Sequence, residues 1–278
     1  MNEPDPIPRR SFLDPRERLN AEGAPFEDAV HIPCSELPGR THELPARDEL
    51  VRVVGPPALR QATIEWLRAH GRRAAAADAP FASGPAAAVT APFAAAPGAR
   101  APGRLWAPNA LLREVAPQLD PGAALDLACG VGRETVFLAA SGWRVVAVDR
   151  LEDALQRGRA LAATYGLGAR IEWVALDLET ATPREGGPLS GGFDLVTVFR
   201  FLHRPLLPWI QARLRPGGSL LYETFTTTHR ARHGKPRRAA LTLAPGELRA
   251  LCAGLEIRHY DEAWRGDAHT ARLWATRP

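Results

Sequence analysis

The stretch Ala124-Leu125-Asp126-Leu127-Ala128-Cys129-Gly130-Val131-Gly132-Arg133 decides the fold of the C-terminal part of the chain. A short apolar run leads directly into small residues, and a helix-favouring segment, 134–140, comes next. Small residues at such a turn let the backbone approach a ligand and adopt positive φ angles. The stretch therefore predicts a strand, a ligand-binding loop and a helix, with the ligand beyond the carboxyl end of the strand.

Strand and helix patterns alternate outward from this stretch to the end of the chain. Strands are predicted at 123–128, 144–148, 171–176, 193–198, 219–224, 257–260 and 271–275, and helices at 134–140, 152–165, 205–214 and 245–252. Such alternation is typical of a parallel sheet covered by helices on both faces, which is an α/β fold. No helix pattern separates the last two strands, so we expect an antiparallel hairpin at one edge of the sheet.

Three carboxylates lie in or directly after the predicted strands. Asp149 ends the second strand, 17 residues after Gly132, where a carboxylate can accept both hydroxyls of a ribose. Asp177 follows the third strand and could accept from an adenine amino group. We expect Asp126 to face the loop, which suits a ligand that carries an amino group. The loop fails the glycine spacing of dinucleotide-binding sites, because Thr135 stands where the last glycine is required. A dehydrogenase is therefore the disfavoured alternative.

Together these motifs resemble those of the class I S-adenosylmethionine-dependent methyltransferases. Segment 126–132 resembles their first motif, with Ala128 where glycine is commoner; 193–196 resembles the fourth, and 216–218 the turn before the fifth strand. The resemblance covers about 104–278. Segment 126–149 is most similar to the branch containing tellurite-resistance and thiopurine-type enzymes.

The resemblance implies a seven-stranded Rossmann-like sheet with the last strand antiparallel, and S-adenosylmethionine as the cofactor. The residues that it implies for cofactor binding are Asp126, Ala128, Cys129, Gly130, Gly132, Asp149, Arg150, Asp177, Leu178 and Phe199.

The reaction itself needs mainly positioning, and a general base only where the acceptor must lose a proton. Arg200 is a candidate for holding an anionic acceptor, and His203 is a candidate for the general base. Tyr222, near the end of the fifth predicted strand, is a third catalytic candidate at the same edge of the sheet. Alternatively, His203 caps the helix that starts at Pro205, and Tyr222 is a core residue. The basic run 226–240 is predicted to be an irregular loop: a cover over an anionic substrate, a solvated loop or an RNA-binding segment.

The N-terminal part, about residues 10–75, resembles rhodanese-like domains through 14–17 (Asp-Pro-Arg-Glu) and 31–33 (His-Ile-Pro). Those enzymes carry a cysteine directly after the Val-Val strand, where amides activate its thiolate. Here that loop reads Gly55-Pro56-Pro57, and Cys34 lies elsewhere. We therefore predict no sulfurtransferase activity, and a structural or recognition module at 1–78. A linker rich in Ala, Pro and Gly, 79–103, would join it to the catalytic domain, 104–278.

Composition bears on disulfides, metal sites, membrane spans and nucleic-acid binding. Three scattered cysteines predict neither a disulfide framework nor a metal site. Without an apolar run of about 18 residues we expect no membrane span, and the acidic, Pro-rich start is no signal peptide, so a cytoplasmic location is predicted. A net charge of +4 over 278 residues disfavours nucleic acid as a partner without excluding it.

The expected function is therefore methyl transfer from S-adenosylmethionine to a small acceptor, with anionic and sulfur-containing compounds as the options. A non-catalytic sensor or scaffold that binds the cofactor, and an RNA or protein methyltransferase, stay open as alternatives. The acceptor and the oligomeric state do not follow from the sequence.

Overall fold

The computed structural model describes residues 5–17, 21, 26, 28–77, 102–180 and 187–278. The chain divides into two compact units, Met1–Ala107 and Pro108–Pro278. The predicted linker 79–103 lies outside the described residues except at its last two positions. No described helix is long and apolar enough to cross a membrane.

The first unit contains a four-stranded parallel sheet in the order β2-β1-β3-β4. Its elements are β1 (Phe12–Asp14), β2 (Ala29–His31), β3 (Leu50–Val53), helix α2 (Pro57–Ala69) and β4 (Arg73–Ala76). Leu13, Val51 and Val53 of the sheet pack against Ile64 and Leu67 of α2 in one apolar core. The chain thus forms a strand and a helix on either side of the loop that starts at Gly55, as the sequence predicts. The rhodanese-like assignment itself stays a prediction.

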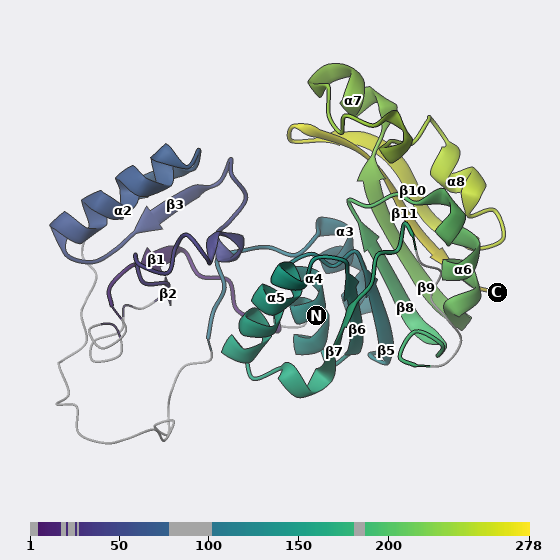
Figure 1. Cartoon of the computed structure of the whole chain (residues 1–278), viewed down its shortest axis with the longest axis horizontal. Helices are drawn as coiled ribbons and strands as arrows, with labels where there is room; N and C mark the ends of the chain where they lie inside the picture. The colour runs from purple at the N-terminus through teal and green to yellow at the C-terminus, as the bar shows by residue number, and fades with distance from the viewer. Residues whose placement is uncertain (1–4, 18–20, 22–25, 27, 78–101, 181–186) are drawn as a thin grey trace. The chain divides into compact units, whose positions relative to one another are not determined.

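The second unit contains a seven-stranded sheet in the order β10-β11-β9-β8-β5-β6-β7 (Figure 1). Its strands are β5 (Ala123–Leu127), β6 (Arg144–Asp149), β7 (Ile171–Ala175), β8 (Phe193–Phe199), β9 (Leu214–Phe225), β10 (Glu256–Arg265) and β11 (Ala268–Thr276). β5 to β9 run parallel, whereas β11 is antiparallel to both β9 and β10. This confirms the predicted α/β fold, including the terminal hairpin.

The helices of this unit are α3 (Ala110–Val115), α4 (Arg133–Ala140), α5 (Glu152–Thr164), α6 (Leu207–Arg213), α7 (Thr227–His233) and α8 (Glu247–Leu251). The predicted helix 205–214 is divided into a 3-10 turn, Arg204–Leu206, and α6. In α4 and α5 the predicted and observed bounds differ by one residue.

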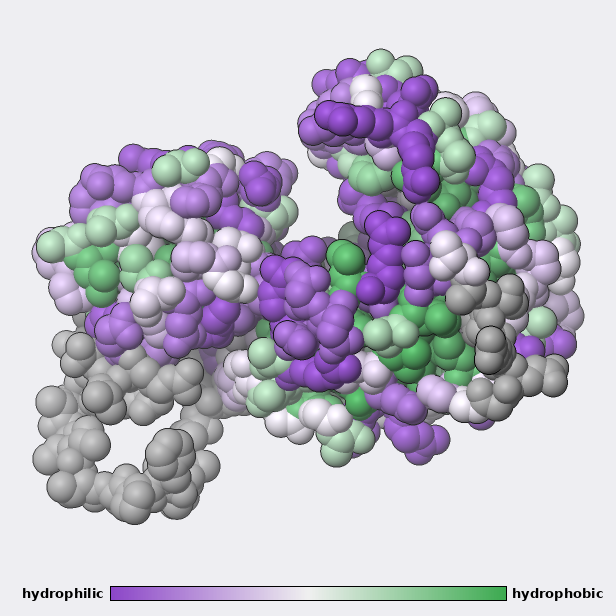
Figure 2. Space-filling view, viewed as in Figure 1, coloured by the Kyte–Doolittle hydropathy of each residue, from purple (hydrophilic) through white to green (hydrophobic). Residues whose placement is uncertain are grey.

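The 226–240 segment is not the irregular loop that the sequence predicts, because α7 lies within it. The side chain of Thr226 accepts a hydrogen bond from the backbone of His229, which caps the start of the helix. Gly234 ends it in the left-handed conformation. Figure 2 shows that the surface over α7 is strongly hydrophilic.

Residue alternation along β5 separates the two faces of the sheet. Leu125 and Leu127 point into the core cluster that also contains Leu207 of α6 and Leu248 of α8. Asp126 points to the other face, toward α4. Helices therefore cover both faces, and the ligand-binding edge is the one where β5 to β8 end.

Candidate active site

A cleft of about 250 Å³ opens at the carboxyl ends of four parallel strands. It is lined by residues that follow β5, β6, β7 and β8 in turn: Ala128, Asp149, Arg150, Leu151, Leu176, Asp177, Leu178, Glu179, Arg200 and Phe201. The chain leaves β5 toward β6 on one side and returns through β8 on the other. The cleft thus lies at the point where the strand order reverses, which is where ligands bind in such sheets.

The loop after β5 has the backbone that the sequence predicts. Ala128, Gly130 and Gly132 have φ angles of +54°, +56° and +69°. The backbone N–H of Gly130 donates to Oδ2 of Asp149 over 2.8 Å, and Oδ1 of Asp149 accepts from the backbone of Leu151 over 2.9 Å. Asp149 therefore fixes the loop after β5 against the loop after β6, with its carboxylate held at the wall of the cleft.

Trp173 of β7 packs beneath this loop. A Cβ atom added to Gly132 would come within 2.5 Å of the Trp173 ring, and one added to Gly158 of α5 would come equally close. Both glycines leave room for the indole, so the loop, α5 and β7 are packed together through one side chain.

Asp126 does not face the loop, contrary to the expectation from the sequence. Its carboxylate is almost fully buried and accepts hydrogen bonds from the hydroxyls of Thr135 (2.5 Å) and Thr197 (2.9 Å). Burial, together with the charge of Glu134, raises the pKa of Asp126 to about 7. Because its carboxylate is buried in the core and does not line the cleft, the geometry favours a structural role for this residue.

Asp177 and Leu178 form the wall of the cleft after β7. The carboxylate of Asp177 lies 3.9 Å from the guanidinium of Arg150 and also accepts from the backbone of Glu179 over 2.9 Å. Leu151 is one of two large apolar side chains that are exposed within the described residues. The cleft therefore offers carboxylates at two strand ends and apolar surface between them.

Cys129, Gly130, Gly132 and Phe199 lie close to this wall in the chain but are not among the residues that line it. Burial raises the pKa of the Cys129 thiol, so it is not a reactive thiolate. These positions shape the loop and the end of β8.

Arg200 lies at the other wall, directly after β8. Its φ angle is +59°, which is uncommon for a residue with a side chain. Its backbone donates to the carbonyl of Glu223 over 2.8 Å, and its guanidinium lies 4.6 Å from the ring centre of Phe225. Among the described residues no carboxylate is paired with this guanidinium. Arg200 thus lines the cleft, and no described carboxylate neutralises its charge.

His203 and Tyr222, the other two catalytic candidates, do not line the cleft. His203 precedes the 3-10 turn at Arg204 but makes no capping hydrogen bond with its side chain. Tyr222 is buried, and its hydroxyl donates to the carbonyl of Phe201 over 2.9 Å. Burial also raises the pKa of Tyr222, which disfavours proton transfer by its hydroxyl. Tyr222 is therefore a core residue, which is the alternative that the sequence analysis left open.

Four lining residues were missed in the sequence analysis: Leu151, Leu176, Glu179 and Phe201. Each is adjacent in sequence to a predicted site residue, and only the geometry of the strand ends shows that it lines the cleft as well.

Fold and cleft together define a Rossmann-like α/β fold with its cleft at the switch point of the sheet. Residues 124–218 match the family model described as "Methyltransferase domain". The domain match indicates S-adenosylmethionine as its cofactor.

Two curated relatives match parts of the chain. Hemagglutinin 1 of Eikenella corrodens is 31% identical over 163 residues, which cover 56% of this chain and 51% of that protein. Uncharacterized protein UNK4.09 of Schizosaccharomyces pombe is 26% identical over 185 residues, or 53% of this chain and 55% of that protein. The chain thus spans about half the length of the curated relatives it matches.

Solved structures with a similar fold include the N-methyltransferase NodS from Bradyrhizobium japonicum WM9, at 19% identity and a TM-score of 0.48, covering 60% of this chain and 92% of that one. TehB from Haemophilus influenzae is similar at 18% identity and a TM-score of 0.49, covering 60% of this chain and 61% of that one.

Proposed function

We propose that the C-terminal unit transfers the methyl group of S-adenosylmethionine to a small anionic acceptor that binds beside Arg200. The observation that carries this proposal is that one cleft is lined by Asp149 and Asp177 and also by Arg200, whose guanidinium is paired with no carboxylate of the described residues.

The cofactor side of the cleft fits an adenosyl group. Asp149 offers a carboxylate to the ribose, Asp177 offers one to the adenine amino group, and Leu151, Leu178 and Phe201 offer apolar surface to the base. When bound, the cofactor supplies an activated methyl group on a sulfonium. The protein's part is then to hold the acceptor in line with that methyl and to exclude water.

Arg200 lines the cleft, and the chain carries further basic residues in α7 and the segment after it, of which Arg238 lies 3.4 Å from the carboxylate of the lining residue Glu179. An acceptor that is already an anion needs no proton removed before it attacks the methyl group. This fits a cleft wall that contains neither His203 nor Tyr222, and it favours an anion over a neutral thiol.

Calorimetry with S-adenosylmethionine on the full chain tests the cofactor half of the proposal. We expect binding by the wild type and its loss in Asp149→Ala. Asp153→Ala is the matched control, because that carboxylate is exposed and pairs with Arg157 on the surface of α5. Absence of binding by the wild type would overturn the proposal.

A screen that follows cofactor consumption with oxyanions, carboxylic acids, small thiols and tRNA tests the acceptor half. We expect Arg200→Ala to raise KM for an anionic acceptor while cofactor affinity is unchanged; Arg258→Ala, an exposed arginine paired with Glu256, is the control. Cofactor binding without turnover of any compound would favour the sensor instead. Salt-sensitive methylation of tRNA alone would favour the RNA enzyme.

A further inference from the structure

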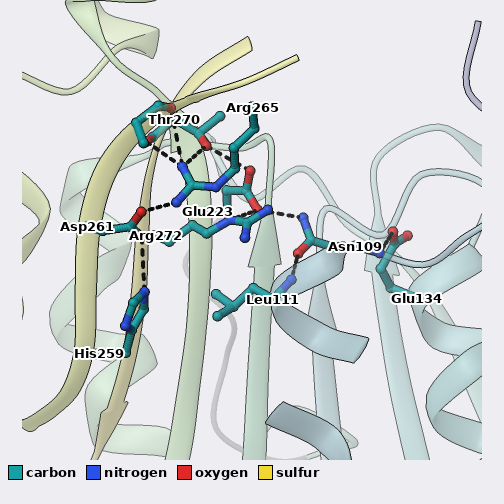
Figure 3. Close-up of polar contacts among 10 residues, drawn as sticks. Asn109, Leu111, Glu134, Glu223, His259, Asp261, Arg265, Thr270 and Arg272 are labelled. Carbon is teal, nitrogen blue, oxygen red and sulfur yellow. Dashed lines mark hydrogen bonds and ion pairs between the residues drawn. The ribbon is translucent and has the colours of Figure 1, made fainter. Parts of the chain in front are cut away.

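Asn109 stands at the start of α3 and contacts two regions that are distant in sequence (Figure 3). Its side-chain oxygen accepts from the backbone of Leu111 over 2.8 Å, which caps the helix. Its side-chain amide donates to Oε2 of Glu223 over 2.9 Å, and its backbone N–H donates to Oε1 of Glu134 over 3.1 Å. One residue thus contacts both the start of α4 and the end of β9.

Glu223 is a rigid partner for that amide. Its side chain is buried, and it also accepts from the hydroxyl of Thr270 over 2.8 Å and from Nε of Arg272 over 3.0 Å. Its backbone carbonyl receives the N–H of Arg200, the cation of the cleft. The end of β9 is therefore fixed on one side to β11 and on the other to the cleft.

Glu134 places the second contact at the cofactor loop. It lies in the first turn of α4, two residues after Gly132. The loop that ends at Gly132 contains Gly130, whose backbone N–H donates to Asp149. A contact that fixes Glu134 therefore also fixes the start of α4, which directly follows this loop.

We propose that Asn109 is a positioning residue that fixes the cofactor loop relative to the end of β9, and that cofactor affinity depends on its amide. The inference rests on the proposed function, because it assumes that S-adenosylmethionine binds at this loop. A side-chain donor is required at this position, because the amide of Asn109 donates to the buried carboxylate of Glu223, while the backbone N–H of the same residue donates to Glu134.

The variant Asn109→Asp tests the hydrogen bond of the amide to Glu223 separately from the cap of α3. Aspartate caps helices as well as asparagine does, so α3 is retained, whereas the donor to Glu223 is replaced by a like charge. Loss of a charge-assisted hydrogen bond predicts about tenfold weaker binding of S-adenosylmethionine near neutral pH. Asn109→Ala, which loses both cap and amide, serves as the comparison.

The dependence of cofactor affinity on pH distinguishes the proposed role from a purely structural one. Once protonated, the new carboxyl group in Asn109→Asp donates to Glu223 again, so the ratio of its affinity to that of the wild type should recover as pH falls. Asn109→Ala should show no such recovery.

The experiment is calorimetry with S-adenosylmethionine on the full chain, for the wild type and both variants, across the range in which all stay folded by circular dichroism. Equal affinity of Asn109→Asp and the wild type, or a ratio independent of pH, would overturn the inference. Failure of the wild type to bind overturns the proposed function instead, so the two failures are distinguishable.

Discussion

The hydroxyl of Thr197 donates to the carboxylate of Asp126 over 2.9 Å and joins β8 to β5 at the centre of the sheet. A second hydroxyl, that of Thr135, joins the same carboxylate to α4. Two neutral donors only partly offset the cost of burying a charge, and burial is the main reason that the pKa of Asp126 is raised to about 7.

Asp126→Asn should therefore change how stability depends on pH. Below the unfolded pKa of 3.8 both states carry the proton, whereas between 3.8 and about 7 only the folded state keeps it. Asp126 thus lowers the free energy of unfolding as pH rises through this window, by at most about 1.4 kcal/mol per pH unit. In urea unfolding of both proteins, we expect wild-type stability minus variant stability to fall across the window and level off above it. Parallel curves would contradict the assignment.

Tyr222→Phe should lower stability by about 1 kcal/mol, because the carbonyl of Phe201 loses its donor. Methyl transfer and cofactor affinity should stay close to those of the wild type. Thermal unfolding and the cofactor-consumption assay measure both effects. A large loss of turnover without loss of stability would restore Tyr222 as a catalytic residue.

Gly158→Ala should be destabilising although alanine is the better helix former. The added Cβ would lie 2.5 Å from the Trp173 ring, and overpacking costs about 1 to 3 kcal/mol, against a gain of about 1 kcal/mol in helix propensity. Gly168→Ala is the matched control, since nothing lies within 4 Å of its Cβ position. Adding Trp173→Leu should relieve the effect of Gly158→Ala; if the double variant is no more stable than Trp173→Leu alone, the packing argument is wrong.

Ala128→Gly should raise stability by up to about 1 kcal/mol, because the residue has a φ angle of +54° that alanine adopts with strain. We expect cofactor binding to be kept, since the loop already has the required backbone. Ala160→Gly, on the exposed side of α5, should show the opposite sign, with a loss of about 1 kcal/mol. Equal losses in both variants would show that the loop is not strained at Ala128.

The sequence predicts the part of the site that depends on strand ends. Asp149 and Asp177 could be placed at the cleft because each follows an apolar strand, and parallel strands present their carboxyl ends at one edge. α7 could also have been predicted, since Thr226 and Gly234 are the residues that start and end such a helix.

The burial of Asp126 could not be predicted, because it depends on hydroxyls that reach it from another strand and a helix. The contact of Asn109 with Glu223 spans 114 residues of sequence and leaves no periodic signal. The structure is therefore needed to identify polar contacts between segments that are distant in sequence.

The order of the last strands has a consequence for how the chain folds. β11 is made after β10, yet it lies between β10 and β9 in the sheet. β10 consequently has no native partner until β11 has been made, because β11 is the only strand that pairs with it among the described residues. Until then the edge of β9 is unpaired, and the pairings of β5 to β8 can form first. We therefore expect completion of this half of the sheet to be a late, cooperative step of folding.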